Sequence, residues 1–297
     1  MTNRASLFAC LLSATALAAP AAACPHYDTV VAAVQADDTT SAELLYEEIV
    51  FSAACDDAIR EWVGDYLARE RFLQARATEE PETGRALLRE ALQYERHWRS
   101  LAELGRLDWQ DGEYAAASVL LQEAINEIAE GDQAHAASEA EIAELYELAT
   151  AALALADAPV EMPRTRSGTL GGVFTMSIRG FTVEEVSLPI TFAYDSTEFD
   201  EIGSDYAEAL VEHVTLTAPA AIYLGGHTDP TGGEAYNLEL STARAERVEA
   251  LLRENGFEGE IVASGYGETQ VPEAPPGIEP GSDEHHRLAR RVAFSVE

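Results

Sequence analysis

The pattern of apolar and polar positions divides the chain into two parts. From about residue 28 to 157, apolar residues recur at helical spacing in a background rich in Ala, Leu and Glu. From residue 188 onward, the period alternates between that of strands and that of helices. The stretch between them, 158–187, has no helical period and carries four glycines and two prolines, so we predict a linker there, with a short strand at 173–178.

The N-terminal part, 24–157, is predicted to be an all-α domain. Its best-formed unit is LAELGRLDWQDGEYAAASVLLQEAINEI, residues 101–128. The small and large residues of this unit, such as Gly105 and Leu121, resemble those of a tetratricopeptide helix pair. Asp108 departs from that pattern, because the repeat usually has an aromatic residue there. An irregular helical bundle is the alternative, and both interpretations predict helices throughout.

The C-terminal part, 188–297, is predicted to fold as a compact α/β sandwich with helices packed on a sheet. The order is strand, helix, strand, helix, strand, strand. The predicted strands are 188–194, 221–224, 261–264 and 292–296, and the predicted helices are 206–216 and 236–255. Gly256 follows the second helix as its C-cap. The whole chain is therefore predicted to be of the α+β class.

Residues 1–23 have the features of a secretory signal. Arg4 supplies the positive start, Leu7 to Leu17 supply an apolar core, and small residues up to Ala23 form a cleavage region. The sequence after this signal contains no apolar run of the roughly 18 residues needed to span a bilayer. We expect the mature protein to be exported to the periplasm and soluble, unless a lipid anchors it.

The cysteines support two alternatives. Cys10 leaves with the predicted signal, so Cys24 and Cys55 remain. In an oxidising compartment an even pair predicts one disulfide. The alternative is a bacterial lipoprotein in which Cys24, the last residue of AAAC, carries the lipid. That alternative leaves Cys55 as a lone thiol and predicts a lipid-mediated association with the outer membrane.

Composition excludes several classes of protein. The chain has 53 acidic and 19 basic residues and a net charge of −34, which argues against nucleic acid and anionic membranes as ligands. His227 lies two positions before Asp229, and His285 is followed by a second histidine, but no set of His, Cys, Asp and Glu has the spacing of a zinc site. We therefore expect no cofactor and no metal, and we do not expect an enzyme.

One arginine lies where the helical pattern would place an aliphatic residue. Arg244 has Leu240 four residues before it and Val248 four residues after it, and no acid stands at helical spacing from it. Its partner must come from a loop or from a ligand. Asp229, in the turn before this helix, is the candidate within the chain. The turn gives Asp229 a second interpretation, because Asp229-Pro-Thr-Gly232 suits a type I turn.

The residues around Arg244 resemble a known family. The stretch GHTDPTGGEAYNLELSTARAERVEALL, the GYGE at 265–268 and the RLARRV at 287–292 are similar to the OmpA C-terminal, peptidoglycan-binding domain family. The resemblance extends over about 186–297. It implies the α/β sandwich predicted above and non-covalent binding of peptidoglycan. One motif departs from the family, since NRRV is replaced by Ala289-Arg-Arg-Val292.

The resemblance also implies a binding site. Asp229 and Arg244 match the residues that hold diaminopimelate of the peptidoglycan stem peptide, and Asn237, Arg290 and Asp195 match further site positions. Diaminopimelate ends in an ammonium and a carboxylate on one carbon. A carboxylate such as Asp229 suits the ammonium, and a guanidinium suits the carboxylate through two parallel hydrogen bonds.

These expectations combine into one functional hypothesis. The protein is expected to act in the periplasm or at the outer membrane, to bind peptidoglycan through its C-terminal domain, and to recruit a protein client through its helical domain. A periplasmic interaction scaffold whose wall binding is vestigial is the main alternative. A peptidoglycan hydrolase is a weaker one, because a nucleophile with an acid–base pair is not evident in the sequence.

Overall fold

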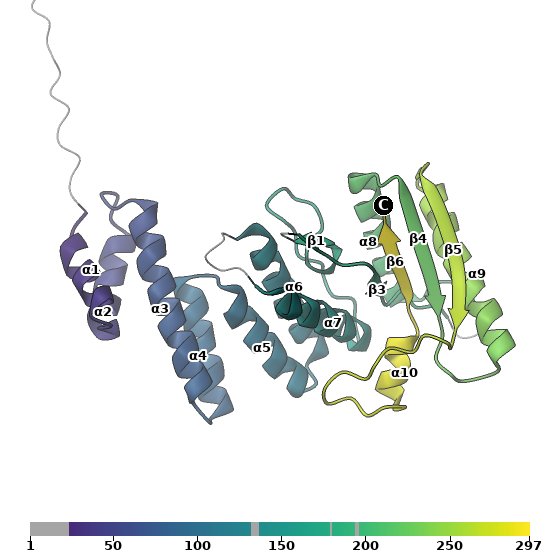
Figure 1. Ribbon diagram of the computed structural model, residues 1–297, viewed down its shortest axis with the longest axis horizontal. Coiled ribbons are helices and arrows are strands. Elements are labelled where there is room, and N and C mark those ends of the chain that lie inside the picture. The colour runs from purple at the N-terminus through teal and green to yellow at the C-terminus, as the bar shows by residue number, and fades with distance from the viewer. Residues whose placement is uncertain (1–23, 132–136, 179, 194–195) are drawn as a thin grey trace, which may run out of the picture. The chain divides into compact units, whose positions relative to one another are not determined.

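The computed structural model describes residues 24–131, 137–178, 180–193 and 196–297. The predicted signal, 1–23, lies outside the described residues. A helical N-terminal region is followed by a mixed α/β region, as predicted (Figure 1). The chain forms two compact units that divide after Leu67, within helix α3 (Asp57–Ala77). No helix in the described ranges combines the length and the apolar composition needed to cross a bilayer.

The first unit contains helices α1 (Tyr27–Gln35) and α2 (Thr39–Val50) and the start of α3. Its buried apolar side chains include Val30, Ala42, Ile49, Ile59, Val63 and Leu67. A disulfide joins Cys24 to Cys55, which are 31 residues apart, as the pairing of the cysteines predicted. A lipid on Cys24 would occupy the same sulfur atom, so lipidation and this disulfide exclude one another.

Four further helices complete the helical region. They are α4 (Pro81–Tyr94), α5 (Trp98–Gln110), α6 (Tyr114–Glu130) and α7 (Glu139–Leu155). Proline occupies the first turn of α4, where its missing N–H costs no hydrogen bond. Ser138 and Glu141 form a capping box at the start of α7. The prediction of helices throughout this region is confirmed.

Helices α5 and α6 form the pair that the sequence picked out. A Cβ atom on Gly105 would lie 2.8 Å from the Leu121 side chain, so the glycine allows the two helices to pack closely. Asp108 forms an ion pair with Arg85 of α4, and Arg85 is 6% exposed. The carboxylate at position 108 therefore neutralises a buried guanidinium, which an aromatic residue could not do. The tetratricopeptide resemblance stays a prediction.

The sheet of the C-terminal region has four strands in the order β3-β6-β4-β5. Their bounds are Val186–Leu188 for β3, Ala221–His227 for β4, Glu260–Gly267 for β5 and Val292–Val296 for β6. Strands β4 and β5 are parallel, and the other pairs are antiparallel. Helices α8 (Glu201–Thr217) and α9 (Glu234–Glu254) lie behind the sheet in the view of Figure 1.

Three details differ from the predicted elements. The first strand ends at Leu188 rather than at 194, because Pro189 has no N–H to donate to a ladder. A short helix, α10 (Asp283–Ala289), lies before the last strand and was not predicted. The strand expected at 173–178 is instead a 3₁₀ turn, η2 (Gly172–Phe174), followed by a hairpin of β1 (Ser177–Ile178) and β2 (Phe181–Thr182).

The segment predicted to be a linker, 158–187, contributes to a core. Phe174 is buried, and its ring lies 4.9 Å from the His213 ring and 5.9 Å from the Phe294 ring. The backbone N–H of Val160 donates to the Tyr206 hydroxyl at 3.0 Å. Buried side chains thus continue from α5 to the sheet within the second compact unit. The apolar residues of this segment follow no regular period, so a periodicity analysis does not detect their burial.

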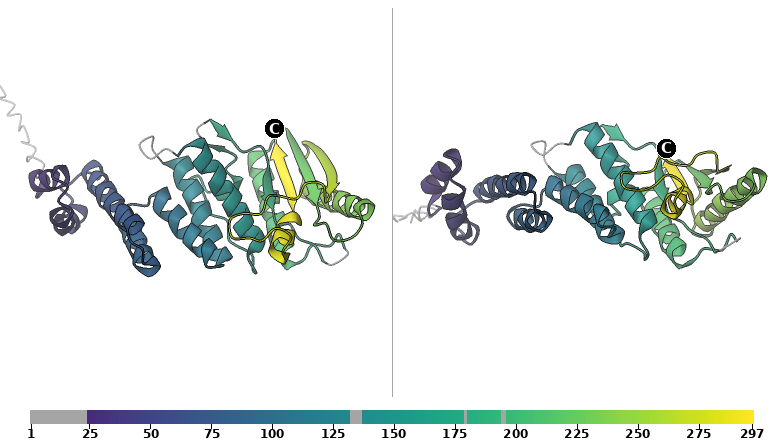
Figure 2. Two further views of the ribbon diagram at one scale, coloured as in Figure 1. Left: turned by 60° about the horizontal axis from the view of Figure 1, so that its bottom comes forward. Right: turned by 90° about the horizontal axis from the view of Figure 1, so that it is seen from below.

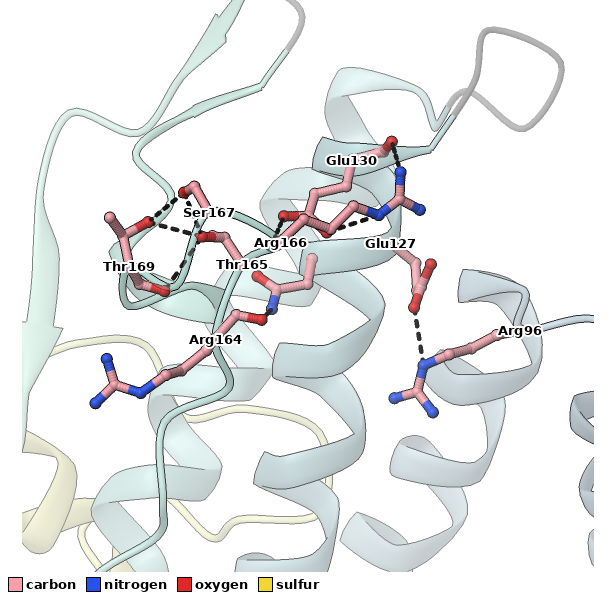
Figure 3. A network of polar contacts seen from close by, with 9 residues as sticks. Arg96, Glu127, Glu130, Arg164, Thr165, Arg166, Ser167 and Thr169 are labelled. Atoms are coloured by element: carbon pink, nitrogen blue, oxygen red, sulfur yellow. Dashed lines mark hydrogen bonds and ion pairs between the residues drawn. The ribbon is translucent and has the colours of Figure 1, made fainter.

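Polar contacts also attach this segment to α6 (Figure 3). The backbone N–H of Arg166 donates to a Glu130 carboxylate oxygen at 2.5 Å. The Asn126 amide donates to the Arg164 carbonyl at 3.4 Å, and its oxygen accepts from the Gly172 N–H at 2.7 Å. The backbone of the segment is therefore hydrogen-bonded to a neighbouring helix, as buried backbone requires.

Candidate functional site

The candidate site lies where β4 ends and α9 begins. Gly226 of β4 and Gly265 of β5 are neighbours in the parallel register. A Cβ atom on Gly226 would lie 2.1 Å from the Ser241 carbonyl oxygen, and one on Gly265 would lie 2.2 Å from the Thr242 hydroxyl. These two glycines let α9 approach the strands closely. The chain between β4 and α9 is thereby held as a short turn at the edge of the sheet.

Asp229 uses its two carboxylate oxygens differently. Its Oδ1 accepts a hydrogen bond from the Thr231 backbone N–H at 2.8 Å, which is the turn role that the sequence suggested. Its Oδ2 accepts from Nη1 of Arg290 at 2.5 Å. Burial by itself would raise the pKa of Asp229, but the hydrogen bonds from Arg290 and Thr231 outweigh it and lower that pKa. Asp229 is therefore ionised at neutral pH.

Arg244 has an aromatic neighbour and a backbone acceptor. Its guanidinium lies over the Phe192 ring, 4.9 Å from the ring centroid, and its Nε donates to the Ser196 carbonyl at 3.3 Å. Within the described residues, no carboxylate forms an ion pair with Arg244. Burial lowers the pKa of Arg244, which nevertheless stays charged at neutral pH. The expected contact between Asp229 and Arg244 is not direct, since Arg290 pairs with Asp229.

Asn237 holds the backbone of the turn. It is 2% exposed, and its amide donates to the Asp229 carbonyl at 3.3 Å and to Glu268 Oε2 at 2.5 Å. These bonds connect the turn to the residue that follows β5. Glu268 was not among the predicted site residues, because its contact with Asn237 joins distant parts of the chain. Asp195, which the resemblance implicated, lies outside the described residues.

A pocket of about 720 Å³ opens beside this turn, which is within the usual size range of ligand sites. Asp229, Arg244, Asn237 and Arg290 all line it. Further lining residues are Phe192, Thr228, Thr231, Gly232, Tyr236, Leu240, Asp283 and His286. The sequence did not indicate Asp283 and His286 as site residues, because they belong to the unpredicted helix α10. The pocket thus brings together two carboxylates, of Asp229 and Asp283, and two guanidiniums, of Arg244 and Arg290.

A smaller pocket of about 200 Å³ shares Arg244 and Arg290 with the first and reaches His227. His227 is 1% exposed, and neither ring nitrogen has a hydrogen-bond partner within the described residues. Its ring stacks on Tyr266 at 5.3 Å. Burial, and secondarily the charge of Arg291, lower the pKa of His227 to about 3. His227 is therefore neutral at physiological pH, which does not suit a general acid–base catalyst.

The comparisons with known proteins identify this part of the chain. A model of the OmpA family matches residues 191–279. These residues form an OmpA family domain. The family assignment confirms the recognition made from the sequence. The OmpA-like domain family is non-enzymatic, which agrees with the absence of a catalytic role expected for this part of the chain.

Part of the chain is similar to segments of longer proteins. The chain is 33% identical over 116 residues to outer membrane porin F of Pseudomonas fluorescens, covering 39% of this chain and 34% of the porin. It is 32% identical over 111 residues to the photosystem I P700 chlorophyll a apoprotein A2 of Gloeobacter violaceus, covering 36% of this chain and 13% of that protein. The chain therefore spans about a third or less of the length of these relatives.

Two solved structures are similar to part of the chain. A MotB-like protein from Desulfovibrio vulgaris matches with 25% identity and a TM-score of 0.32, over 38% of this chain and 72% of that one. The peptidoglycan-associated lipoprotein from Burkholderia pseudomallei matches with 25% identity and a TM-score of 0.29, over 38% of this chain and 89% of that one.

Proposed function

We propose that the OmpA family domain binds peptidoglycan non-covalently, and that Asp229 and Arg244 hold the zwitterionic end of diaminopimelate in the stem peptide. The main support for this proposal is the set of charged side chains that line the pocket. The carboxylates of Asp229 and Asp283 balance the guanidiniums of Arg244 and Arg290 among its lining residues. A balanced set of separated charges suits a zwitterion better than a simple anion or cation.

The two charged ends of the ligand have distinct places in this proposal. The diaminopimelate ammonium approaches Asp229, whose second oxygen already accepts from Arg290 and can accept another donor. The carboxylate takes the guanidinium of Arg244, which lacks an ion pair within the described residues. Phe192 supports that guanidinium from below. Asn237 and Arg290 act mainly by fixing the turn and the orientation of the Asp229 carboxylate.

We further propose that the protein is exported and acts in the cell envelope, near the outer membrane. The predicted signal sequence and the Cys24–Cys55 disulfide support an oxidising compartment. The match to an outer membrane porin points in the same direction. In this proposal the helical region recruits a partner protein to the wall. A scaffold whose wall binding is vestigial is the second candidate.

Co-sedimentation with purified sacculi tests the wall-binding proposal. The mature protein, residues 24–297, is expected to pellet with sacculi and to be released by soluble diaminopimelate-containing tripeptide. Arg244→Ala should stay in the supernatant at the same protein concentration, while keeping the circular dichroism spectrum of the wild type. Wild-type protein that stays in the supernatant would support the scaffold. Release of stem peptides into solution would support the hydrolase and contradict the proposal.

A further inference from the structure

A second, larger cavity lies away from the diaminopimelate pocket. It has a volume of about 870 Å³ and is bordered by α5, α6, α7 and the loop between β5 and α10. The loop reaches the helices, as Figures 1 and 2 show, and the Trp109 indole N–H donates to the Pro276 carbonyl at 2.8 Å. All of these elements belong to the second compact unit.

A smaller cavity adjoins the large one. It has a volume of about 280 Å³, shares Glu147, Glu273 and Pro275 with the large cavity, and extends along α7 as far as Ala154 and the end of β3. We call these two adjoining cavities together the α7 groove. Two cavities in a row along a helix suit an extended peptide segment better than a compact small molecule.

The floor of the α7 groove is apolar and aromatic, and its rim is acidic. Trp109 and Tyr114 lie edge to face with ring centroids 5.1 Å apart. The lining includes four carboxylates, of Asp111, Glu144, Glu147 and Glu273, and two guanidiniums, of Arg106 and Arg291. This arrangement fits the long side chains of arginine and lysine. Their aliphatic stems can pack on the apolar floor, and their charged ends can reach the carboxylates of the rim.

Two of the rim carboxylates are uncompensated. Glu144 pairs with Arg106 at 3.1 Å, and Asp111 pairs with Arg85. Glu147 and Glu273 are both exposed and form no ion pair within the described residues. These two side chains stand at the point where the large and small cavities meet. They are therefore placed to receive a cationic group near the middle of the groove.

We propose that the α7 groove binds an extended segment of a partner protein that carries arginine or lysine side chains between apolar residues. The charge of the rim and the net charge of −34 favour a basic occupant and disfavour a second copy of this chain. This inference deepens the proposed recruitment of a partner and is independent of wall binding, because the groove shares no lining residue with the diaminopimelate pocket.

Fluorescence anisotropy tests the groove with a defined probe. The probe is a labelled nonapeptide of repeating Leu-Arg-Pro, and a matched peptide carries neutral citrulline in place of arginine. Residues 24–297 should bind the arginine peptide about tenfold more tightly than the citrulline peptide at 0.15 M salt. The double variant Glu147→Arg/Glu273→Arg should lose roughly tenfold in affinity for the arginine peptide.

A matched control separates the groove from the overall negative charge. Glu239→Arg/Glu246→Arg changes the net charge equally at two exposed positions of α9 outside the groove, and it should bind like the wild type. Equal weakening by both double variants, or equal binding of both peptides, would overturn the proposal. So would a dimer in sedimentation velocity that the groove variant abolishes and the control does not. If the groove variant still binds sacculi, binding of a partner in the groove is independent of binding to the wall.

Discussion

At the scale of single residues, Arg244 and Asp229 show how one turn combines structure with binding. Arg244 extends from α9 and places its guanidinium over the Phe192 ring. Asp229 caps its own turn with one oxygen and faces Arg290 with the other. The turn and ligand interpretations of Asp229 are therefore compatible. A substitution that keeps the turn role of Asp229 and removes its charge separates the two interpretations.

Asp229→Asn is that substitution. Asparagine can still accept from the Thr231 N–H, so the turn should persist, and the lost charge opposite Arg290 should cost about 1 kcal/mol of stability. The ligand ammonium loses its counter-charge, so binding to sacculi should fall at least tenfold. Urea denaturation and co-sedimentation measure the two effects. Wild-type sacculus binding by a folded Asp229→Asn protein would show that Asp229 serves the turn alone.

Two buried histidines predict a dependence of stability on pH. Burial lowers the pKa of His213 to about 4 and that of His227 to about 3. The unfolded chain takes up these protons below about pH 6.5, and the folded chain does not until pH 4 or lower. The contribution of these two histidines to the free energy of unfolding is thus fully present above pH 6.5 and is lost as the pH falls below that value. The loss approaches about 1.4 kcal/mol per pH unit for each histidine.

Urea denaturation at pH 7.5 and 5.5 measures this loss before most carboxylates titrate. We expect the free energy of unfolding to fall by about 3 kcal/mol, half of it from each histidine. His213→Phe should remove close to half of that difference, because phenylalanine fits beside Phe174 and Phe294 and does not titrate. Equal stability of the wild type at both pH values would contradict the assignment of neutral buried histidines.

At the scale of elements, local pattern predicted most of the sheet and its helices. Strand β6 and helix α9 match their predicted ranges closely, because alternation marks the strand and Gly256 ends the helix with a φ of +86°. Helix α10 was missed because DEHHRLA is only seven residues long and mostly polar. Because α10 was missed, Asp283 and His286 were not predicted to line the pocket. The contact of Asn237 with Glu268 joins residues 31 positions apart, so sequence spacing does not predict it.

The close packing of α9 on the strands predicts a sensitive glycine. Gly226→Ala places a methyl group 2.1 Å from the Ser241 carbonyl and should force α9 away from β4, at a cost of about 2 kcal/mol or more. Gly233→Ala is the control, since no atom lies within 4 Å of a Cβ there. Thermal unfolding should separate the two variants clearly. Equal melting temperatures would indicate that α9 adjusts without strain.

At the scale of the whole molecule, the chain consists of two compact units with different sources of stability. The second unit has a continuous core from α5 to the sheet, to which the segment 158–187 contributes Val160, Val173 and Phe174 among others. Periodicity identified the helices and the sheet but could not show that they share this core. The first unit is smaller, so its disulfide should contribute a larger share of its stability.

Removal of the disulfide should affect the first unit alone. Cys24→Ser/Cys55→Ser opens a loop of 31 residues and should destabilise that unit by about 3 kcal/mol. The melting of residues 68–297 and the binding to sacculi should not change. Differential scanning calorimetry resolves the two transitions, and intact-mass analysis of protein from the periplasm reports the state of the cysteines. An acyl mass on Cys24 would contradict the disulfide.

The central claim is that Arg244 holds the side-chain carboxylate of diaminopimelate. Isothermal titration calorimetry tests it with two tripeptides, one with that carboxylate free and one with it amidated, against the wild type and Arg244→Gln. The wild type should bind the free peptide at least tenfold more tightly than the amidated one, because a desolvated charge pair is worth about 2 kcal/mol or more. Arg244→Gln should bind both peptides weakly and equally. Discrimination that survives in Arg244→Gln, or that is missing in the wild type, would contradict the claim.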